Sequence, residues 1–338
     1  MSEVVAPPQP APQTGGMKIF LLTLLGLVIL RTALGFVLFP DSLLLIANLL
    51  IGAIFLGAPM VALFFAGREV WTPPKAAAFL VGGLVLQFGL AVLLRQVPSL
   101  ASGPFVNLIV AVSQAGLPIW TGGLGALIAT LLKDKNMILP IAITLAILDL
   151  ILVLTPIGTV NQVMQRAPQV FTSVALNVPK VQSTQTPVKA GHRLEAMGYA
   201  GPADFVFLSM FFVALFRYNM RTKETLYSVV PTLLLYLVLV SLINVPLPAL
   251  VPIGAVILIV NRKEFVLSKD EKIATIGVAV VGLAFLIYGM TRPRPRPVPL
   301  PMETGQAPPG SPNSPGKAPR GSRRSDAPPA SGNTPSPR

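Results

Sequence analysis

The chain has 338 residues, of which 53% are hydrophobic and only 12% are charged, whereas soluble globular proteins usually carry about 25% charged residues. The net charge of +13 comes from cations between apolar stretches and in the C-terminal tail, where membrane topology and anionic lipids account for them, so nucleic-acid binding is not expected. The sequence has no cysteine and a single histidine, His192, which excludes thiol chemistry and argues against a histidine-based metal site.

The apolar stretches predict an all-α polytopic membrane protein. Residues 1–16 are rich in Pro and are expected to be disordered, and residues 17–290 are expected to form a transmembrane domain of about nine helices. Only helices or closed barrels span a bilayer, and these stretches lack the alternation of barrel strands. The predicted spans are 18–39, 43–66, 76–95, 105–132, 137–155, 203–218, 227–244, 248–261 and 273–290.

Two parts of this prediction leave alternatives open. The fourth range contains AGLPIWTGG, from Ala115 to Gly123, and is read either as one long span or as two. The long loop 156–200 contains QVFTSVALNV, from Gln169 to Val178, which is expected to form a strand or a disordered connector. Residues 291–338 are rich in Pro, Ser and Arg and are expected to be a disordered tail. Basic residues favour the loops on the side of the N-terminus, which predicts a cytoplasmic N-terminus.

Two aspartates stand apart because they are the only acidic residues within the apolar ranges. An ionised carboxylate near the bilayer centre costs at least ~2.5 kcal/mol, so such residues usually have a partner or a function. Asp204 opens the run DFVFLSMFF after Gly201-Pro202, and on its own it fits a helix N-cap equally well. Asp149 lies in LAILDLILVL with apolar residues on both sides, which indicates a paired or functional acid.

A pair of buried aspartates is suited to hydrolysis. Two carboxyls within hydrogen-bonding distance cannot both ionise cheaply, so they share one proton. The ionised member can take a proton from an attacking water while the protonated member hydrogen-bonds the substrate carbonyl. This chemistry requires no metal, cofactor or covalent nucleophile.

The motifs around these residues resemble those of presenilins and signal peptide peptidases. GPADFVFLS, from Gly201 to Ser209, is similar to the family signature GxGD-F-x-F-x-S, and Asp149 matches the other catalytic aspartate. LPALVPIG, from Leu247 to Gly254, is similar to the family's PAL region. The resemblance covers about residues 137–261, and it departs from the family where Ala203 replaces the second glycine and Leu148 replaces a tyrosine.

The resemblance implies a presenilin-like bundle and an intramembrane aspartyl endopeptidase that cleaves transmembrane segments of other proteins within the lipid bilayer. Asp149 and Asp204 would be catalytic. The residues bordering the substrate would be Pro248, Ala249, Leu250, Gly201 and Ala203. Two alternatives remain: a proton-coupled transporter that uses the aspartates as a relay, and a catalytically inactive binder of membrane helices.

Overall fold

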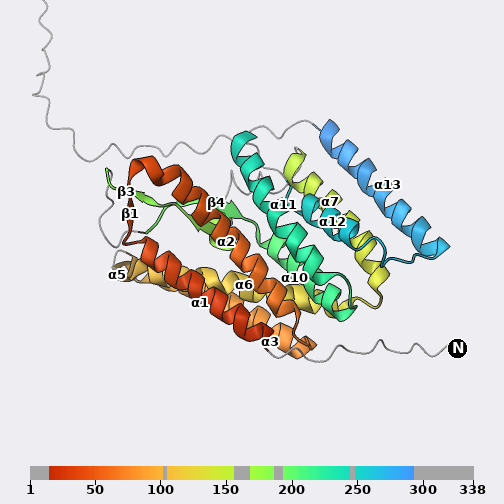
Figure 1. The fold of residues 1–338 in the computed structure, drawn as a ribbon, viewed down its shortest axis with the longest axis horizontal. Helices are drawn as coiled ribbons and strands as arrows, with labels where there is room; N and C mark the ends of the chain where they lie inside the picture. The colour runs from red at the N-terminus through yellow and green to blue at the C-terminus, as the bar shows by residue number, and fades with distance from the viewer. Residues whose placement is uncertain (1–14, 102–104, 156–167, 186–192, 244–247, 293–338) are drawn as a thin grey trace, which may run out of the picture. The chain divides into compact units, whose positions relative to one another are not determined.

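A computed structural model describes residues 15–101, 105–155, 168–185, 193–243 and 248–292. The helices are α1 (Gly16–Leu34), α2 (Leu44–Gly67), α3 (Pro73–Leu84), α4 (Leu90–Gln96), α5 (Pro98–Ala101), α6 (Val106–Leu131), α7 (Ile138–Leu154), α9 (Pro168–Val174), α10 (Pro202–Arg217), α11 (Thr222–Ile243), α12 (Leu250–Val260) and α13 (Lys269–Thr291) (Figure 1). Short helical segments are η1 (Asp41–Leu43), the π-helical η2 (Val85–Gly89) and η3 (Lys135–Met137). The strands are β1 (Leu38–Phe39), β2 (Leu176–Pro179), β3 (Gln182–Ser183) and β4 (Ala196–Ala200).

Within this described part, six helical segments are long and apolar enough to cross a membrane. They cover Gly16–Leu34, Asp41–Gly67, Pro73–Gln96, Val106–Leu131, Lys135–Leu154 and Lys269–Thr291. This confirms the predicted class of an all-α, multi-pass membrane protein. The predicted number of nine spans stays a prediction, because α10 has 16 residues and α12 has 11, fewer than the roughly 20 that usually cross a bilayer. The expected disordered ends, 1–16 and 291–338, lie almost wholly outside the described residues.

The fourth predicted span is one helix, so its interpretation as two segments is wrong. α6 runs for 26 residues through Pro118. Glycines let neighbouring backbones support it, because a Cβ built at Gly116 would lie 2.7 Å from the carbonyl oxygen of Gly83 in α3. Similarly, a Cβ at Gly125 would lie 2.7 Å from the backbone nitrogen of Met210 in α10. Close packing of this kind is how membrane helices tolerate an internal proline.

The helices that carry the two aspartates have different neighbours. α10 packs against α6 and α2, and its apolar side chains fill the main core. α7 packs against α12 and α13, and Figure 1 shows α13 lying beside them. α12 also packs against α11 and contacts α10. It therefore connects the helix of Asp149 to the helix of Asp204.

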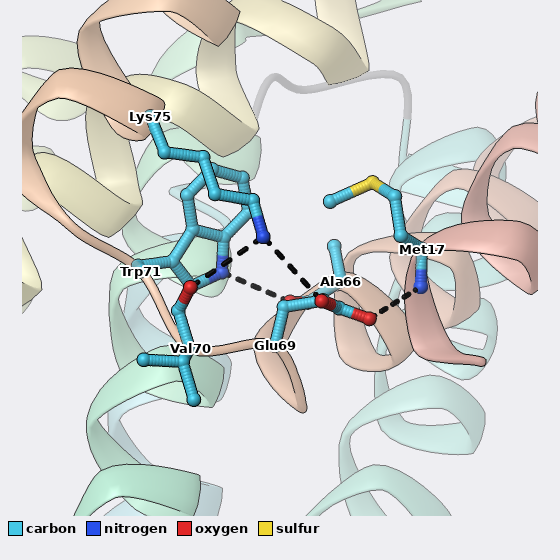
Figure 2. A network of polar contacts seen from close by, with 6 residues as sticks. All are labelled: Met17, Ala66, Glu69, Val70, Trp71 and Lys75. Carbon is cyan, nitrogen blue, oxygen red and sulfur yellow. Dashed lines mark hydrogen bonds and ion pairs between the residues drawn. The ribbon is translucent and has the colours of Figure 1, made fainter. Parts of the chain in front are cut away.

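A polar network fixes the ends of α1, α2 and α3 (Figure 2). The backbone N–H of Met17 donates to Glu69 Oε1 at 3.0 Å, and Lys75 Nζ lies 3.4 Å from Glu69 Oε2. Trp71 Nε1 donates to the carbonyl oxygen of Ala66 at 2.9 Å, while the ammonium of Lys75 lies 5.1 Å from the Trp71 ring centre. The first turn of α1 is thereby tied to the α2–α3 connection.

A small antiparallel hairpin leads into α10. β2 pairs with β4 in the register Leu176 with Ala200, Asn177 with Tyr199 and Val178 with Gly198. The strand predicted over 169–178 is wrong in its first part, because Pro168–Val174 forms α9 and the strand begins at Leu176. Its apolar, β-branched composition also suits a short helix, and periodicity over so few residues cannot decide between the two.

Candidate functional site

Asp204 lies in the first turn of α10. Gly201 is the N-cap residue, Pro202 is the first helical residue, and the Asp204 carboxyl is half-buried with its Oδ2 near Gly201. Pro at this position is favoured because its missing N–H would have no partner within the helix. The N-cap interpretation of Asp204 is therefore wrong in position. The backbone amide of Gly201 nevertheless acts on its carboxylate, as in the acidic half of a capping box.

Asp149 lies near the C-terminal end of α7 and contacts the PAL region directly. The backbone N–H of Leu250 donates a hydrogen bond to Asp149 Oδ2 at 2.7 Å. This donor is available because Leu250 is the first residue of α12, where backbone N–H groups have no partner within the helix. Two of the three sequence motifs thus meet through one short hydrogen bond.

The two aspartates come within electrostatic range of each other. The charge of Asp149 acts on the carboxyl of Asp204, although the residues are 55 positions apart in the chain. Both carboxyls also act on the side chain of Tyr236 in α11. Hydrogen bonds to Leu250 and Pro248 tie Asp149 and Tyr236 to the start of α12, and Asp204 is linked to this cluster by electrostatics alone.

Tyr236 was missed by the sequence analysis. Its hydroxyl donates to the carbonyl oxygen of Pro248 at 2.7 Å, so it holds the residue that precedes the PAL alanine. Leu148, which stands where the resembling family has a tyrosine, is 45% exposed. The only signal for Tyr236 was a polar hydroxyl within an apolar range, since a buried tyrosine usually finds a partner for its O–H.

The other residues predicted to border the substrate adopt ordinary backbone conformations. Gly201 has φ −68° and ψ 143°, which any residue can adopt. Ala203 is exposed in the first turn of α10. Throughout the described ranges, Asn219 is the only non-glycine residue with a positive φ, so the helical backbone of Ala203 is unstrained despite the missing glycine. Ala249 is the N-cap residue of α12, between Pro248 and Leu250.

The cluster contains carboxyl, phenol and backbone amide groups. Over the part of the chain that the structure describes, no three His, Cys, Asp or Glu residues gather in a way that could hold a metal ion. Each of the two carboxyl groups can accept or release a proton, and the Leu250 N–H stabilises the ionised form of Asp149.

Comparisons with known proteins find no relative of this chain. No protein-family model, no curated protein and no solved structure matches the chain.

Proposed function

We propose that the protein is a presenilin-like intramembrane aspartyl protease that hydrolyses peptide bonds within transmembrane segments of other membrane proteins. The hydrogen bond from Leu250 N–H to Asp149 Oδ2, which joins the PAL region to an acid within electrostatic range of Asp204, is the observation that carries the proposal. The two acids have different backbone donors, the Leu250 N–H for Asp149 and the Gly201 N–H for Asp204, and they lie on different helices, so their surroundings are unequal. Unequal acids are what a general base and a general acid require.

The proposed reaction uses Asp149 as the base and Asp204 as the acid. The Asp149 carboxylate takes a proton from water as the water oxygen bonds to the peptide carbon, and the carbonyl oxygen takes the proton of Asp204. The ionised Asp204 then removes a proton from a hydroxyl of this tetrahedral intermediate. The C–N bond breaks as Asp149 gives its proton to the leaving nitrogen. Both acids return to their starting states, with a carboxylic acid and an amine as products.

The hairpin offers a place for the unwound substrate. Peptide bonds in a helix are shielded by their own hydrogen bonds, so the substrate must become extended before attack. β4 ends directly before Gly201, and an extended segment added to its outer edge would lead toward Asp204. We propose that Gly201, Ala203 and the residues Pro248 to Leu250 border this segment.

The setting of this activity is also part of the proposal. The partners are transmembrane segments of substrate proteins and surrounding lipids, and the N-terminus is cytoplasmic. The experiment that tests the function uses purified protein in lipid nanodiscs with a reporter transmembrane segment. Loss of one reporter peptide bond, blocked by a transition-state-like aspartyl protease inhibitor, is expected. Proton-coupled flux without a cleaved bond would identify a transporter instead, and tight reporter binding without cleavage would identify an inactive binder.

A further inference from the structure

Five polar side chains from the N-terminal helices hydrogen-bond the backbone around the hairpin. These anchor residues lie in α1, α2, η2 and α6, within or beside apolar segments. Their bonds are Arg31 Nη1 to Asn177 O at 2.7 Å, Asn177 N to Gln114 Oε1 at 2.9 Å, Gln87 Nε2 to Ser173 O at 2.9 Å, Val181 N to Asn48 Oδ1 at 3.0 Å and Leu194 N to Asn107 Oδ1 at 3.1 Å.

Burial makes these contacts significant. Gln87 and Asn107 are each 1% exposed, and Arg31 is 3% exposed. A buried amide or guanidinium without partners is costly, so such side chains persist where they hydrogen-bond. All five anchor residues bond the backbone at Ser173, Asn177, Val181 or Leu194, which lie in or near β2 or just before β4. Three buried and two half-buried side chains thus bond the backbone in and around β2 and just before β4, although Gln87 also accepts a hydrogen bond from Trp120.

Asn177 shows what the anchoring does to the edges of the sheet. Its backbone N–H goes to Gln114 and its carbonyl accepts from Arg31, so both groups point away from β4. In an antiparallel ladder the residue opposite such a position also points both groups outward. That residue is Tyr199, whose N–H and C=O therefore lie on the outer edge of β4. Side chains occupy the outer edge of β2. The outer edge of β4 is left for pairing with an added strand, and we call this edge the template.

We infer that the anchor residues are positioning residues that pre-form the hairpin and direct an extended substrate to β4. The inference rests on the proposed function, because it assumes that an extended peptide is the ligand. Arg31 and Gln114 block strand addition to β2, and the other anchors hold the backbone just before and after β2 and just before β4. The template is then ordered before the substrate arrives, so the free energy of substrate binding does not include the entropy cost of ordering it.

The test compares Gln114→Met with Gln114→Glu in full-length protein in nanodiscs. Methionine keeps the length and removes the acceptor for Asn177 N–H, whereas glutamate keeps an acceptor oxygen. Thr121→Val in the same helix is the matched control, since it removes one buried hydrogen bond, to Leu117 O, that does not touch the hairpin. The readouts are hydrogen exchange at the amides of β2 and β4, and KM and kcat for the reporter segment.

For Gln114→Met, we expect faster amide exchange in the hairpin and a KM raised about three- to tenfold with kcat within about twofold, as for loss of one buried hydrogen bond. Gln114→Glu and Thr121→Val should keep wild-type exchange in the hairpin and wild-type KM. Unchanged hairpin exchange in Gln114→Met would overturn the anchoring itself. Faster exchange with a lowered kcat and unchanged KM would overturn the substrate-directing role. If the wild-type protein cleaves nothing, the proposed function and the substrate-directing role are both wrong. The hydrogen-exchange comparison would still test the anchoring in that case.

Discussion

The helices α10 and α7 each carry one aspartate, but they are held in opposite ways. In α10, ten of 16 residues are buried, and the helix packs against α6 and α2. In α7, only Ile138, Ala142 and Leu145 of 17 residues are buried, and the helix packs against α12 and α13. Asp204 is thus fixed by the core, whereas the placement of Asp149 depends on two outer helices and one hydrogen bond from Leu250.

This difference shows on which helix the relative position of Asp149 and Asp204 can be changed without unfolding the bundle. Disturbing α10 should damage the whole bundle, because its backbone meets α6 at Gly125 without intervening side chains. Disturbing α7 should move one carboxyl while the core remains folded. Disturbing α10 should therefore lower activity and stability together, whereas disturbing α7 should lower activity while the core stays folded.

The largest expected effect comes from neutralising either aspartate. Asp149→Asn and Asp204→Asn should each lower cleavage by at least about a thousandfold, because each acid has its own proton-transfer role. Asparagine keeps the shape without the charge, so the thermal midpoint should stay close to that of the wild type in both variants. Rates from single-turnover assays and scanning calorimetry provide the comparison.

The double variant sharpens this prediction. If the acids act as one unit, Asp149→Asn/Asp204→Asn should be no slower than either single variant. If the fold-losses in rate of the two single variants multiplied in the double variant, the two residues would contribute independently, which the proposed shared mechanism does not allow.

The next effect concerns the single hydrogen bond that holds Asp149. Replacing the Leu250 amide by a backbone ester removes only the N–H, and activity should fall roughly tenfold to a hundredfold, as for a hydrogen bond to a charged group. The control is an ester at Ile253, which removes an ordinary helical bond to Ala249 O at 3.3 Å. Equal losses at both positions would show that the Leu250 donor has no special role.

Matched glycine substitutions compare the two sides in stability. Gly125→Ala should lower the free energy of unfolding by about 1–3 kcal/mol, since its Cβ would meet the α10 backbone. Gly282→Ala in α13 meets side-chain atoms of Ile147 at 2.8 Å, which can shift, so a change below about 1 kcal/mol is expected. Gly277→Ala, with nothing within 4 Å, is the control. Denaturation in mixed micelles measures all three, and a larger loss at Gly282 than at Gly125 would contradict the comparison.

The sequence predicted the apolar helices well and the polar contacts poorly. Long runs of apolar residues determine spans locally, so the helices of the membrane domain could be expected. Asp149, Asp204 and Leu250 could be predicted as site residues because they sit in recognisable local sequence. Tyr236 and the anchor residues act on segments far along the chain, and their roles depend on how helices pack. Uncharged amides such as Gln87 and Gln114 within apolar ranges were the available signal, because membrane interiors retain them for hydrogen bonding.

The smallest expected effect is that of the C-terminal tail. Residues 293–338 contain few large apolar residues, so burial cannot offset the entropy of ordering them. Deleting them should leave both the thermal midpoint in detergent and the cleavage rate unchanged within error. A marked loss of stability on deletion would show that the tail contacts the membrane domain.

The central claim is that two aspartates in this bundle hydrolyse a peptide bond with water. Its most direct test is cleavage of the reporter segment in ¹⁸O-labelled water, with mass spectrometry of both fragments for the wild type and for Asp204→Asn. The account predicts one cleaved bond in the wild type, one ¹⁸O atom in the new carboxyl group, and no such product from Asp204→Asn. Intact reporter with the wild type, or labelled product persisting at a substantial rate with purified Asp204→Asn, would contradict it.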